Sequence, residues 1–197
     1  MTQELEEVKQ NVIKCTKCDL CKTRTNAVPG KGNFQSEVIF VGEAPGRNED
    51  KNGEPFVGVA GKKLSIALEN AGVSRDDIYI TNIVKCRPPN NRVPSTVERN
   101  TCQDFLKEEI SIIKPKIICV LGNTAFKSIL GGSEITKFRG KVVRKNNQLY
   151  FLTVHPAATI YNQEFVEVLN NDILKLFQIV KELKNNKKVL IDIEYAP

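Results

Sequence analysis

The sequence predicts an α/β fold in which a mostly parallel sheet is covered by helices on both faces. Short apolar runs of strand length alternate along the chain with longer segments whose apolar residues recur at helical spacing. Strands of a parallel sheet are buried on both faces and are joined by crossover helices, so they read as continuous apolar runs. The alternation therefore indicates a layered α/β architecture.

Strands are expected where β-branched and aromatic residues are bounded by turn residues. The clearest is 38–41, a fully apolar run that stops at Gly42. The other expected strands are 77–84, 116–121 and 149–154, with an edge strand at 138–143. Loops are expected at 23–34, 51–61 and 86–94, because Gly, Pro and polar residues accumulate there.

Helices are expected where apolar residues recur every three or four positions. These segments are 2–14, 62–71, 95–113, 122–130 and 164–183. Ser95 and Glu98 form a capping-box pattern at the start of the third segment, and Pro115 lies just beyond its end. Residues 184–197 form a Lys- and Asn-rich break followed by a short tail, to which the sequence assigns no role.

The composition indicates one globular domain spanning 1–197. The chain has 197 residues, of which 41% are hydrophobic and 26% charged. Its 29 Lys and Arg exceed its 23 Asp and Glu, and the net charge of +6 favours an anionic partner such as nucleic acid. No apolar run approaches the roughly 20 residues needed to cross a bilayer, and the N-terminus lacks the features of a signal peptide. We therefore expect a cytoplasmic protein with no membrane partner.

Three polar side chains directly follow predicted parallel strands. They are Glu43, Asn82 and His155. Because the carboxyl ends of parallel strands meet at one edge of a sheet, where ligands bind in open α/β folds, these side chains are expected to converge there. An ordinary turn would equally explain Glu43, and a lone histidine such as His155 is often a structural hydrogen-bonding group. The small residues of the HPAA segment favour a substrate-facing role for His155.

The cysteines divide by context. Cys15 and Cys18 form a CxxC motif, Cys86 follows a predicted strand, and Cys102 lies within a predicted helix. In a cytoplasmic protein, four such thiolates suit either a structural zinc or an iron-sulfur cluster, and their spacing does not choose between the two. The other two cysteines are Cys21, which adds a second CxxC register, and Cys119, which reads as a buried apolar residue.

Two further features favour a ligand site without requiring one. Phe56 lies in a predicted loop, where it could present a flat apolar face or fill the core. A group of basic residues precedes the strand that ends at His155. Its members are Lys137, Arg139, Lys141, Arg144 and Lys145. They could contact phosphate or form a solvated edge.

Five ordered motifs give the chain a family resemblance that covers about residues 12–160. They are CTKC with TRTNAVPGKG, VGEAPGRNED, GEPFVGVAG, ITNIVKCRPPNNRVP and VHPAA. In this order and spacing they resemble the family 4 uracil-DNA glycosylases of bacteria and archaea. The resemblance implies a three-layer α/β/α sandwich with a four-stranded, mostly parallel sheet.

The resemblance also implies a 4Fe-4S cluster held by four cysteines. By motif the ligands are Cys15, Cys18, Cys86 and Cys102. Cys21 falls where the family does not require a cysteine, so we expect it to be a bystander. The cluster is expected to be structural, because hydrolysis of a glycosidic bond needs no electron, and an additional contact with DNA is left open.

The implied activity is that of a monofunctional glycosylase, which flips uracil out of DNA and hydrolyses its N-glycosidic bond during base excision repair. Charge then develops as an anion on uracil and a cation on the sugar. The resemblance implies that His155 hydrogen-bonds uracil O2 and stabilises the departing anion. Glu43 would face the sugar, either as a base or as a group that positions the water.

The remaining implied pocket residues recognise the base. Asn82 would donate to uracil O4 and accept from N3–H, the pattern that distinguishes uracil from cytosine. Phe56 would stack on the base, and Glu49 would lie near C5, where it excludes the methyl group of thymine. Backbone groups of Gly42 and Ala44 would complete the pocket.

The implied partner is uracil-containing DNA, single- or double-stranded, bound by a monomer. Phosphate contacts are expected from Arg87, Arg92, Lys137, Arg139 and Lys141. The segment 157–161 resembles the loop that wedges into the duplex, although it has no obvious Leu wedge. A sliding clamp as a further partner has no support in the sequence.

Two other functions are compatible with parts of this pattern. One is a non-catalytic iron-sulfur or zinc protein that binds nucleic acid through its basic face. The other is covalent capture of uracil-DNA, as in a related branch with a basic, His-containing insertion before its last motif. The corresponding ITKFRGKVV segment contains no histidine, which argues against covalent capture.

Overall fold

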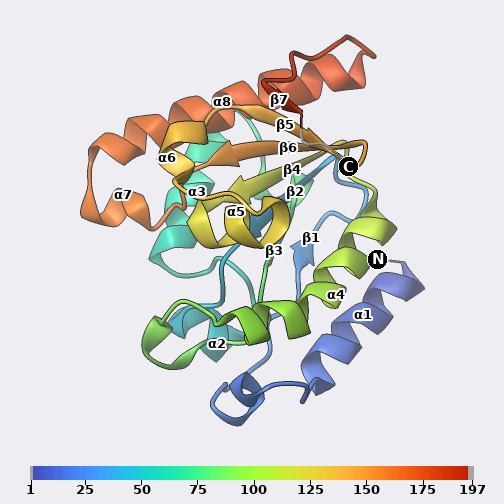
Figure 1. Ribbon diagram of the computed structural model, residues 1–197, viewed down its shortest axis with the longest axis vertical. Helices are drawn as coiled ribbons and strands as arrows, with labels where there is room; N and C mark the ends of the chain where they lie inside the picture. The colour runs from blue at the N-terminus through green and yellow to red at the C-terminus, as the bar shows by residue number, and fades with distance from the viewer. Residues whose placement is uncertain (1, 195–197) are drawn as a thin grey trace.

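The structure, a computed structural model, describes residues 2–194 as a mixed sheet with helices on both faces (Figure 1). Within these residues the sheet has seven strands in the order β1-β3-β2-β4-β6-β5-β7. The strands are β1 (Lys31–Gly32), β2 (Val38–Gly42), β3 (Tyr79–Asn82), β4 (Ile117–Leu121), β5 (Val142–Lys145), β6 (Gln148–Thr153) and β7 (Ile193–Glu194).

The helices confirm all five segments predicted from apolar periodicity, with small shifts at their ends. They are α1 (Gln3–Lys14), α2 (Arg47–Asn52), α3 (Val59–Asn70), α4 (Thr96–Ile113), α5 (Gly122–Leu130), α6 (Ile135–Phe138), α7 (Ala158–Tyr161) and α8 (Glu164–Lys184). Single 3-10 turns occur at η1 (Asp19–Lys22), η2 (Arg75–Asp77) and η3 (Pro89–Asn91). The capping box at the start of α4 is present, because the Ser95 hydroxyl accepts from Glu98 N and the Glu98 carboxylate accepts from Ser95 N.

The centre of the sheet consists of the four predicted parallel strands. β3, β2, β4 and β6 pair in parallel, and Gly42 aligns with Asn82 while Leu121 aligns with Thr153. The expected four-stranded sheet is too narrow, however, because β1 and β5 add antiparallel edges and β7 pairs with β5. The outermost strands β1 and β7 contain two residues each and lack the apolar runs that reveal the central strands.

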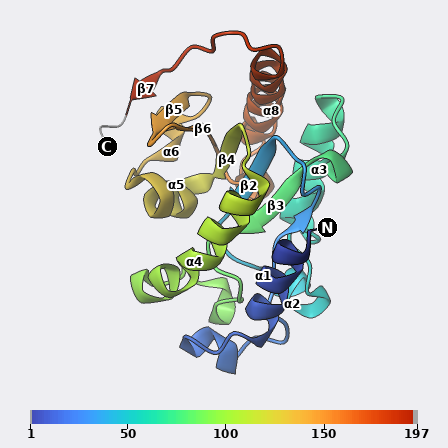
Figure 2. The same cartoon turned by 90° about the vertical axis from the view of Figure 1, so that its right-hand side faces the viewer.

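Alternation along the central strands creates two separate cores. In β2, Ile39 and Val41 pack with residues of α1, α4, α5 and α6, whereas Val38 and Phe40 pack with residues of α3 and α8. Figure 2 shows α5 and α6 on one side of the sheet and α3 and α8 on the other. The three-layer α/β/α sandwich is therefore confirmed.

Several elements differ from the expectation; the strand expected at 77–84, for example, is shorter and spans only Tyr79–Asn82. Instead of a strand over 138–143, α6 extends to Phe138, Gly140 turns the chain with φ +73°, and β5 begins at Val142. The expected loop at 51–61 is shortened, since α3 begins at Val59. α2 was not expected, because its sequence RNEDKN has no apolar periodicity. It begins where Gly46 and Glu49 form a capping arrangement.

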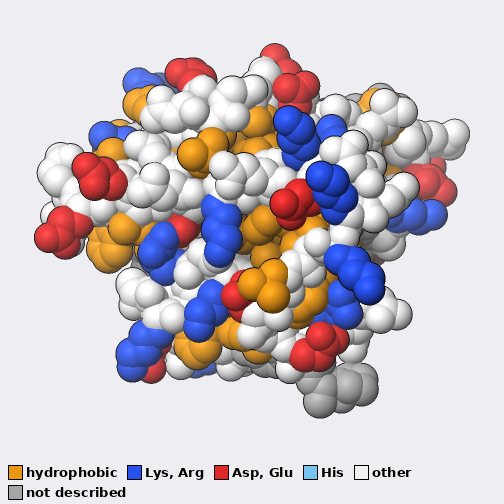
Figure 3. Space-filling view, turned by 90° about the horizontal axis from the view of Figure 1, so that it is seen from above, with side chains coloured by type: hydrophobic (Ala, Val, Ile, Leu, Met, Phe, Trp, Pro, Cys, Tyr) orange, Lys and Arg blue, Asp and Glu red, His pale blue; other side chains and the backbone are white. Residues whose placement is uncertain are grey.

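One face of the protein surface carries charged side chains of both signs (Figure 3). Figure 3 looks down on the face that carries α8 and the C-terminal segment, where Lys and Arg side chains are interspersed with Asp and Glu. Among the described residues, no helix combines the length and the apolar character that a bilayer crossing needs.

Candidate active site

The ends of the parallel strands bring the predicted polar residues together. Glu43 after β2, Asn82 at the end of β3 and His155 after β6 all line one cavity of about 310 Å³. This convergence follows from the parallel register, which places these strand ends at the same edge of the sheet. The cavity is also lined by Ala44, Pro45, Gly46, Glu49, Phe56, Ala60, Pro88, Asn91, Arg92, Ala157 and Tyr161.

Asn82 has an unusual environment for a buried amide. Its side chain is 2% exposed, and its Oδ1 has no hydrogen-bond partner among residues 2–194. A Cβ atom added to Gly42 would lie 2.5 Å from this oxygen and 2.6 Å from Cζ of Phe56. A glycine at position 42 thus allows the amide and the aromatic ring to approach the same point. A buried acceptor without a donor is rare in proteins and suits a ligand N–H.

Phe56 adopts a backbone conformation that is uncommon for an aromatic residue. Its φ is +54° and its side chain is 5% exposed. Two contacts hold this loop: Arg75 donates to the Pro55 carbonyl at 2.7 Å, and the absence of a side chain at Gly61 leaves room for the Phe56 carbonyl. The Phe56 ring lies 5.8 Å from the His155 ring, centroid to centroid, so the two rings form adjacent walls of the cavity. Backbone strain of this kind is often found at functional sites.

His155 is held as a neutral imidazole. The Ala157 N–H donates to His155 Nδ1 at 3.2 Å, so Nδ1 carries no proton and the ring proton lies on Nε2. Enclosure of the ring lowers the pKa of His155 to about 4, although the nearby Glu49 opposes this effect. The ring therefore offers one N–H donor at neutral pH.

Thr124 is a site residue that sequence reasoning missed. Its hydroxyl donates to Glu43 Oε2 at 2.5 Å, and so fixes the carboxylate at the cavity. Thr124 lies in the first turn of α5, directly after β4. β4 is the fourth parallel strand to end at this edge, and that signal could have identified Thr124 beforehand.

Glu49 lies at the predicted pocket but is engaged by the backbone. Its Oε2 accepts from Gly46 N at 3.1 Å, and its Oε1 accepts from Gly58 N at 2.7 Å. The carboxylate therefore ties the turn after β2 to the loop that carries Phe56. The Glu49 side chain forms part of the cavity wall and holds the two loops together.

The four predicted cysteine ligands come from distant segments and line one small apolar cavity. Cys15 and Cys18 follow α1, Cys86 follows β3 and Cys102 lies in α4, and their neighbours there include Val12, Leu20, Val84 and Phe105. Arg24 Nη1 lies 2.9 Å from Cys86 Sγ, and Lys85 N lies 3.2 Å from Cys102 Sγ. All six cysteines are free thiols. Cys21 does not line this cavity, and Cys119 is fully buried in β4.

The chemistry of this donor set fits an iron-sulfur cluster. Among the residues that the structure describes, no three His, Cys, Asp or Glu side chains are placed to hold one metal ion. Thiolates with N–H donors directed at them, in an apolar shell, are the surroundings that iron-sulfur clusters prefer.

The predicted phosphate contacts already have partners within the protein. Arg92 lines the cavity and forms a fork with Glu98 at 2.7 and 2.8 Å, which lowers the pKa of Glu98 to about 2. Arg87 donates to Asn91, and Lys137 pairs with Glu134. Arg139 forms an ion pair with the buried Asp172, and Lys141 lies 5.4 Å from the centre of the Phe138 ring. Of these five residues, Arg92 alone lines the cavity at the strand ends.

The cavity lining includes one highly exposed aromatic side chain. Tyr161, at the end of α7, is 89% exposed and lines the cavity. Val93, in the loop after β3, and Val97, in the first turn of α4, are also exposed, at 59% and 72%, but they do not belong to the cavity lining. Tyr161 belongs to the 157–161 segment singled out in the sequence, whereas the two valines follow the CRPPNNR segment.

Comparison with known proteins agrees with this geometry. Residues 29–176 match the family described as the Uracil DNA glycosylase superfamily. The chain is 47% identical over 185 residues to a type-4 uracil-DNA glycosylase of Sulfurisphaera tokodaii, covering 89% of this chain and 84% of that protein. It is 46% identical to the type-4 enzyme of Saccharolobus solfataricus, with 95% and 90% covered, and 42% identical to that of Archaeoglobus fulgidus, with 90% and 94% covered. The chain therefore belongs to the type-4 uracil-DNA glycosylases of the uracil-DNA glycosylase superfamily.

Proposed function

We propose that the cavity at the strand ends accepts uracil flipped out of DNA, and that the protein hydrolyses its N-glycosidic bond to leave an abasic site. The observation that carries this proposal is the unpaired, buried Oδ1 of Asn82 beside Phe56 and His155. Uracil presents an N3–H donor next to the O4 acceptor, and an asparagine amide matches both groups. Phe56 stacks on the base, while Gly42 and Ala44 supply the backbone wall.

His155 acts on the leaving group. The pyrimidine ring gains negative charge as the bond to the sugar breaks, and the Nε2–H donor stabilises that charge at O2. Because the ring is neutral and fixed through Nδ1, the donor is in place before the reaction begins. No proton has to be transferred to the base for this effect.

Glu43 acts on the sugar side. With Oε2 held by the Thr124 hydroxyl, its other carboxylate oxygen is left for the attacking water. The carboxylate also favours the positive charge that develops on the sugar. Either taking the water proton or orienting the water would require this fixed position.

Specificity against thymine is assigned to Glu49. The side chain lies in the cavity wall, and its two backbone hydrogen bonds prevent it from moving aside. A methyl group at C5 of the base would meet this carboxylate and its backbone partners. We propose that this contact excludes thymine.

The direct test of the activity uses a labelled duplex that contains one uracil. Incubation followed by alkali should produce one strand break at the uracil, and a thymine or cytosine in its place should give none. The extent of cleavage should then be compared between substrates with uracil opposite guanine, uracil opposite adenine and uracil in a single strand. Retained DNA binding without any strand break would instead support the non-catalytic nucleic-acid-binding alternative.

The pH dependence provides a second test. The pKa of His155 is about 4 in the folded protein and near 6.5 in an unfolded chain, so the unfolded chain binds more protons between these values. Burial of the neutral ring therefore makes its full contribution to the free energy of unfolding above pH 6.5, and this contribution declines as the pH falls toward 4. Activity needs only the neutral folded form, so kcat/KM should show no protonation of His155 between pH 7 and about pH 5. A decline centred near pH 6.5, measured well below the unfolding temperature, would contradict the neutral-donor role.

Cys15, Cys18, Cys86 and Cys102 would hold a 4Fe-4S cluster, whose contribution is structural. It would join the segment after α1 to α4 and to the loop after β3. We expect a brown protein with broad visible absorption, and Cys86→Ala should lose this absorption and lower the unfolding temperature. Cys21→Ala is the matched control and should retain both. A colourless protein that contains zinc would contradict the assignment.

DNA would lie across the cavity mouth. Arg87, Arg92, Lys137, Arg139 and Lys141 are proposed to contact phosphate, with their internal partners exchanged on binding. The segment 157–161, which ends at the exposed Tyr161, is proposed to press against the bases beside the flipped nucleotide. The salt dependence of binding measures the phosphate contacts, since each neutralised phosphate adds about 0.9 to the slope for duplex DNA.

We also propose that residues 1–197 form one domain that works as a monomer in the cytoplasm. β7, from the C-terminal segment, joins the same sheet as the other strands. Six free cysteines suit a reducing compartment. Sedimentation of the loaded protein at working concentration would test the monomer.

A further inference from the structure

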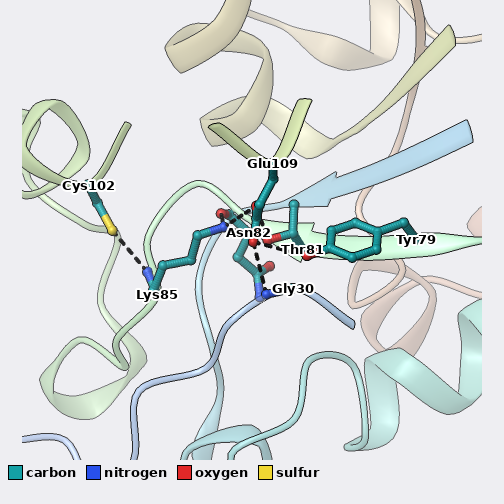
Figure 4. A network of polar contacts seen from close by, with 7 residues as sticks. All are labelled: Gly30, Tyr79, Thr81, Asn82, Lys85, Cys102 and Glu109. Atoms are coloured by element: carbon teal, nitrogen blue, oxygen red, sulfur yellow. Dashed lines mark hydrogen bonds and ion pairs between the residues drawn. The ribbon is translucent and has the colours of Figure 1, made fainter. Parts of the chain in front are cut away.

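A buried ion pair contacts the backbone of Asn82, the residue proposed to recognise uracil. The side chains of Lys85 and Glu109 are each 1% exposed, and Lys85 Nζ lies 2.7 Å from Glu109 Oε2. Lys85 follows β3, while Glu109 belongs to α4 on the same face of the sheet. Figure 4 shows the Lys85 side chain extending from the side of Cys102 toward Glu109, Asn82 and Thr81.

All three ammonium donors of Lys85 are occupied. Nζ donates to Glu109 Oε2, to Thr81 Oγ1 at 2.5 Å and to the backbone carbonyl of Asn82 at 3.0 Å. A lysine ammonium has three N–H groups, so none remains for another acceptor. The ammonium therefore binds the backbone of Asn82 while leaving its side-chain oxygen without a donor.

Glu109 is satisfied just as completely. Oε2 also accepts from Thr81 Oγ1 at 2.9 Å, and Oε1 accepts from Gly30 N at 3.0 Å and from Tyr79 OH at 3.3 Å. These contacts join α4, β3 and the loop before β1 at one point (Figure 4). The burial and bonding of both charges make this group of atoms rigid.

Stability alone is a weak explanation for this pair. Burying two charges removes them from water, and well-packed apolar residues in their place are often as stable or more stable. The pair does, however, contact Asn82, which among residues 2–194 is one of two residues with a buried side-chain oxygen that lacks a hydrogen-bond partner. A mobile Asn82 would turn that oxygen toward any free donor nearby, and the occupied ammonium offers none.

We propose that Lys85 and Glu109 are positioning residues for uracil recognition, an inference that rests on the proposed function. They fix the end of β3 so that Asn82 Oδ1 faces the cavity, unpaired, before the base arrives. The Lys85 N–H also donates to Cys102 Sγ, so this residue connects the cysteine cavity to the uracil site. Preorganisation of this kind lowers the free-energy barrier because no group has to rotate when the base enters.

The test replaces both charges, so that neither is left buried alone. The double variant Lys85→Met with Glu109→Leu keeps an apolar, similar-sized filling and should still fold, at a lower unfolding temperature because Gly30 N and the Tyr79 and Thr81 hydroxyls lose their acceptor. Its visible absorption should also be unchanged. Single-turnover release of uracil from a single-stranded oligonucleotide should nevertheless be slower by about 100-fold, the effect expected when a reacting group is misplaced by about 1 Å. Inhibition by free uracil should weaken as well, because the same amide binds the product.

The matched control is Lys107→Met with Asp104→Leu, which removes an exposed pair on the same helix. It should leave release and inhibition unchanged. If the buried double variant does not fold, Thr81→Val is the second variant: it retains both charges and frees one Lys85 N–H to compete for Asn82. Release by Thr81→Val should be slower by about 10-fold, the cost of one misdirected hydrogen bond.

The outcomes separate the two proposals. If the parent protein releases uracil and the folded double variant does so equally fast, the positioning role is overturned while the function stands. A Thr81→Val variant with the parent rate would count against positioning in the same way. If the parent protein itself releases no uracil, the function is overturned and this inference with it.

Discussion

His155→Ala is expected to slow the release of uracil by about 10²- to 10³-fold, the usual cost of removing one preorganised donor from a developing anion. The loss should appear in kcat, because the Nε2–H contact strengthens only as charge moves onto O2. Single-turnover measurements on a single-stranded substrate isolate this step from the opening of the duplex. An effect on KM with an unchanged rate would contradict the assignment.

His155→Gln is the informative companion variant, because glutamine restores one N–H donor without a titratable ring. It should recover part of the lost rate, and its activity should not depend on the pH range in which a histidine titrates. Both variants should keep the visible absorption of the parent, since the cysteine cavity lies elsewhere in the fold. Equal losses in the two variants would indicate that the ring serves only to fill space beside Phe56.

Asn82→Leu is expected to change activity and stability in opposite directions. The substitution removes the donor for O4 and the acceptor for N3–H, and each unpaired group on the base costs about 1 to 3 kcal/mol. Together these costs correspond to a loss of about 10²-fold or more in the rate of release. In the free protein, however, Leu removes the buried oxygen that has no partner, so the free energy of unfolding should rise by about 1 kcal/mol.

Denaturant unfolding and single-turnover release, measured on the same preparation, check this prediction. Thr153→Val is a suitable comparison, because it removes a buried polar group that is hydrogen-bonded, to Asp172 at 2.7 Å. That substitution should lower stability. If Asn82→Leu also lowered the free energy of unfolding, the Asn82 amide would make a stabilising contact within the protein that the structure does not show. Such a result would remove the main support for Asn82 as the reader of uracil.

Much of the site could be predicted because the strands are parallel. Glu43, Asn82 and His155 each follow a recognisable apolar run, and parallel strands end at a common edge. Helix α4 was likewise predictable from its capping box and periodicity, and α8 from its periodicity. The short α2 and the two-residue strands β1 and β7 were not, because such short segments carry no periodic signal.

The sequence by itself therefore determined the layered fold, the order of its central elements and the edge at which three functional side chains meet. Only the tertiary structure decided which groups hold these side chains in place. Thr124 hydrogen-bonds Glu43, and the Lys85–Glu109 pair contacts the backbone of Asn82. The local sequence pattern indicates whether a segment is a helix or a strand and which residues end it. Hydrogen bonds between residues far apart in the chain depend instead on how helices pack on the sheet, and packing is decided by the whole core.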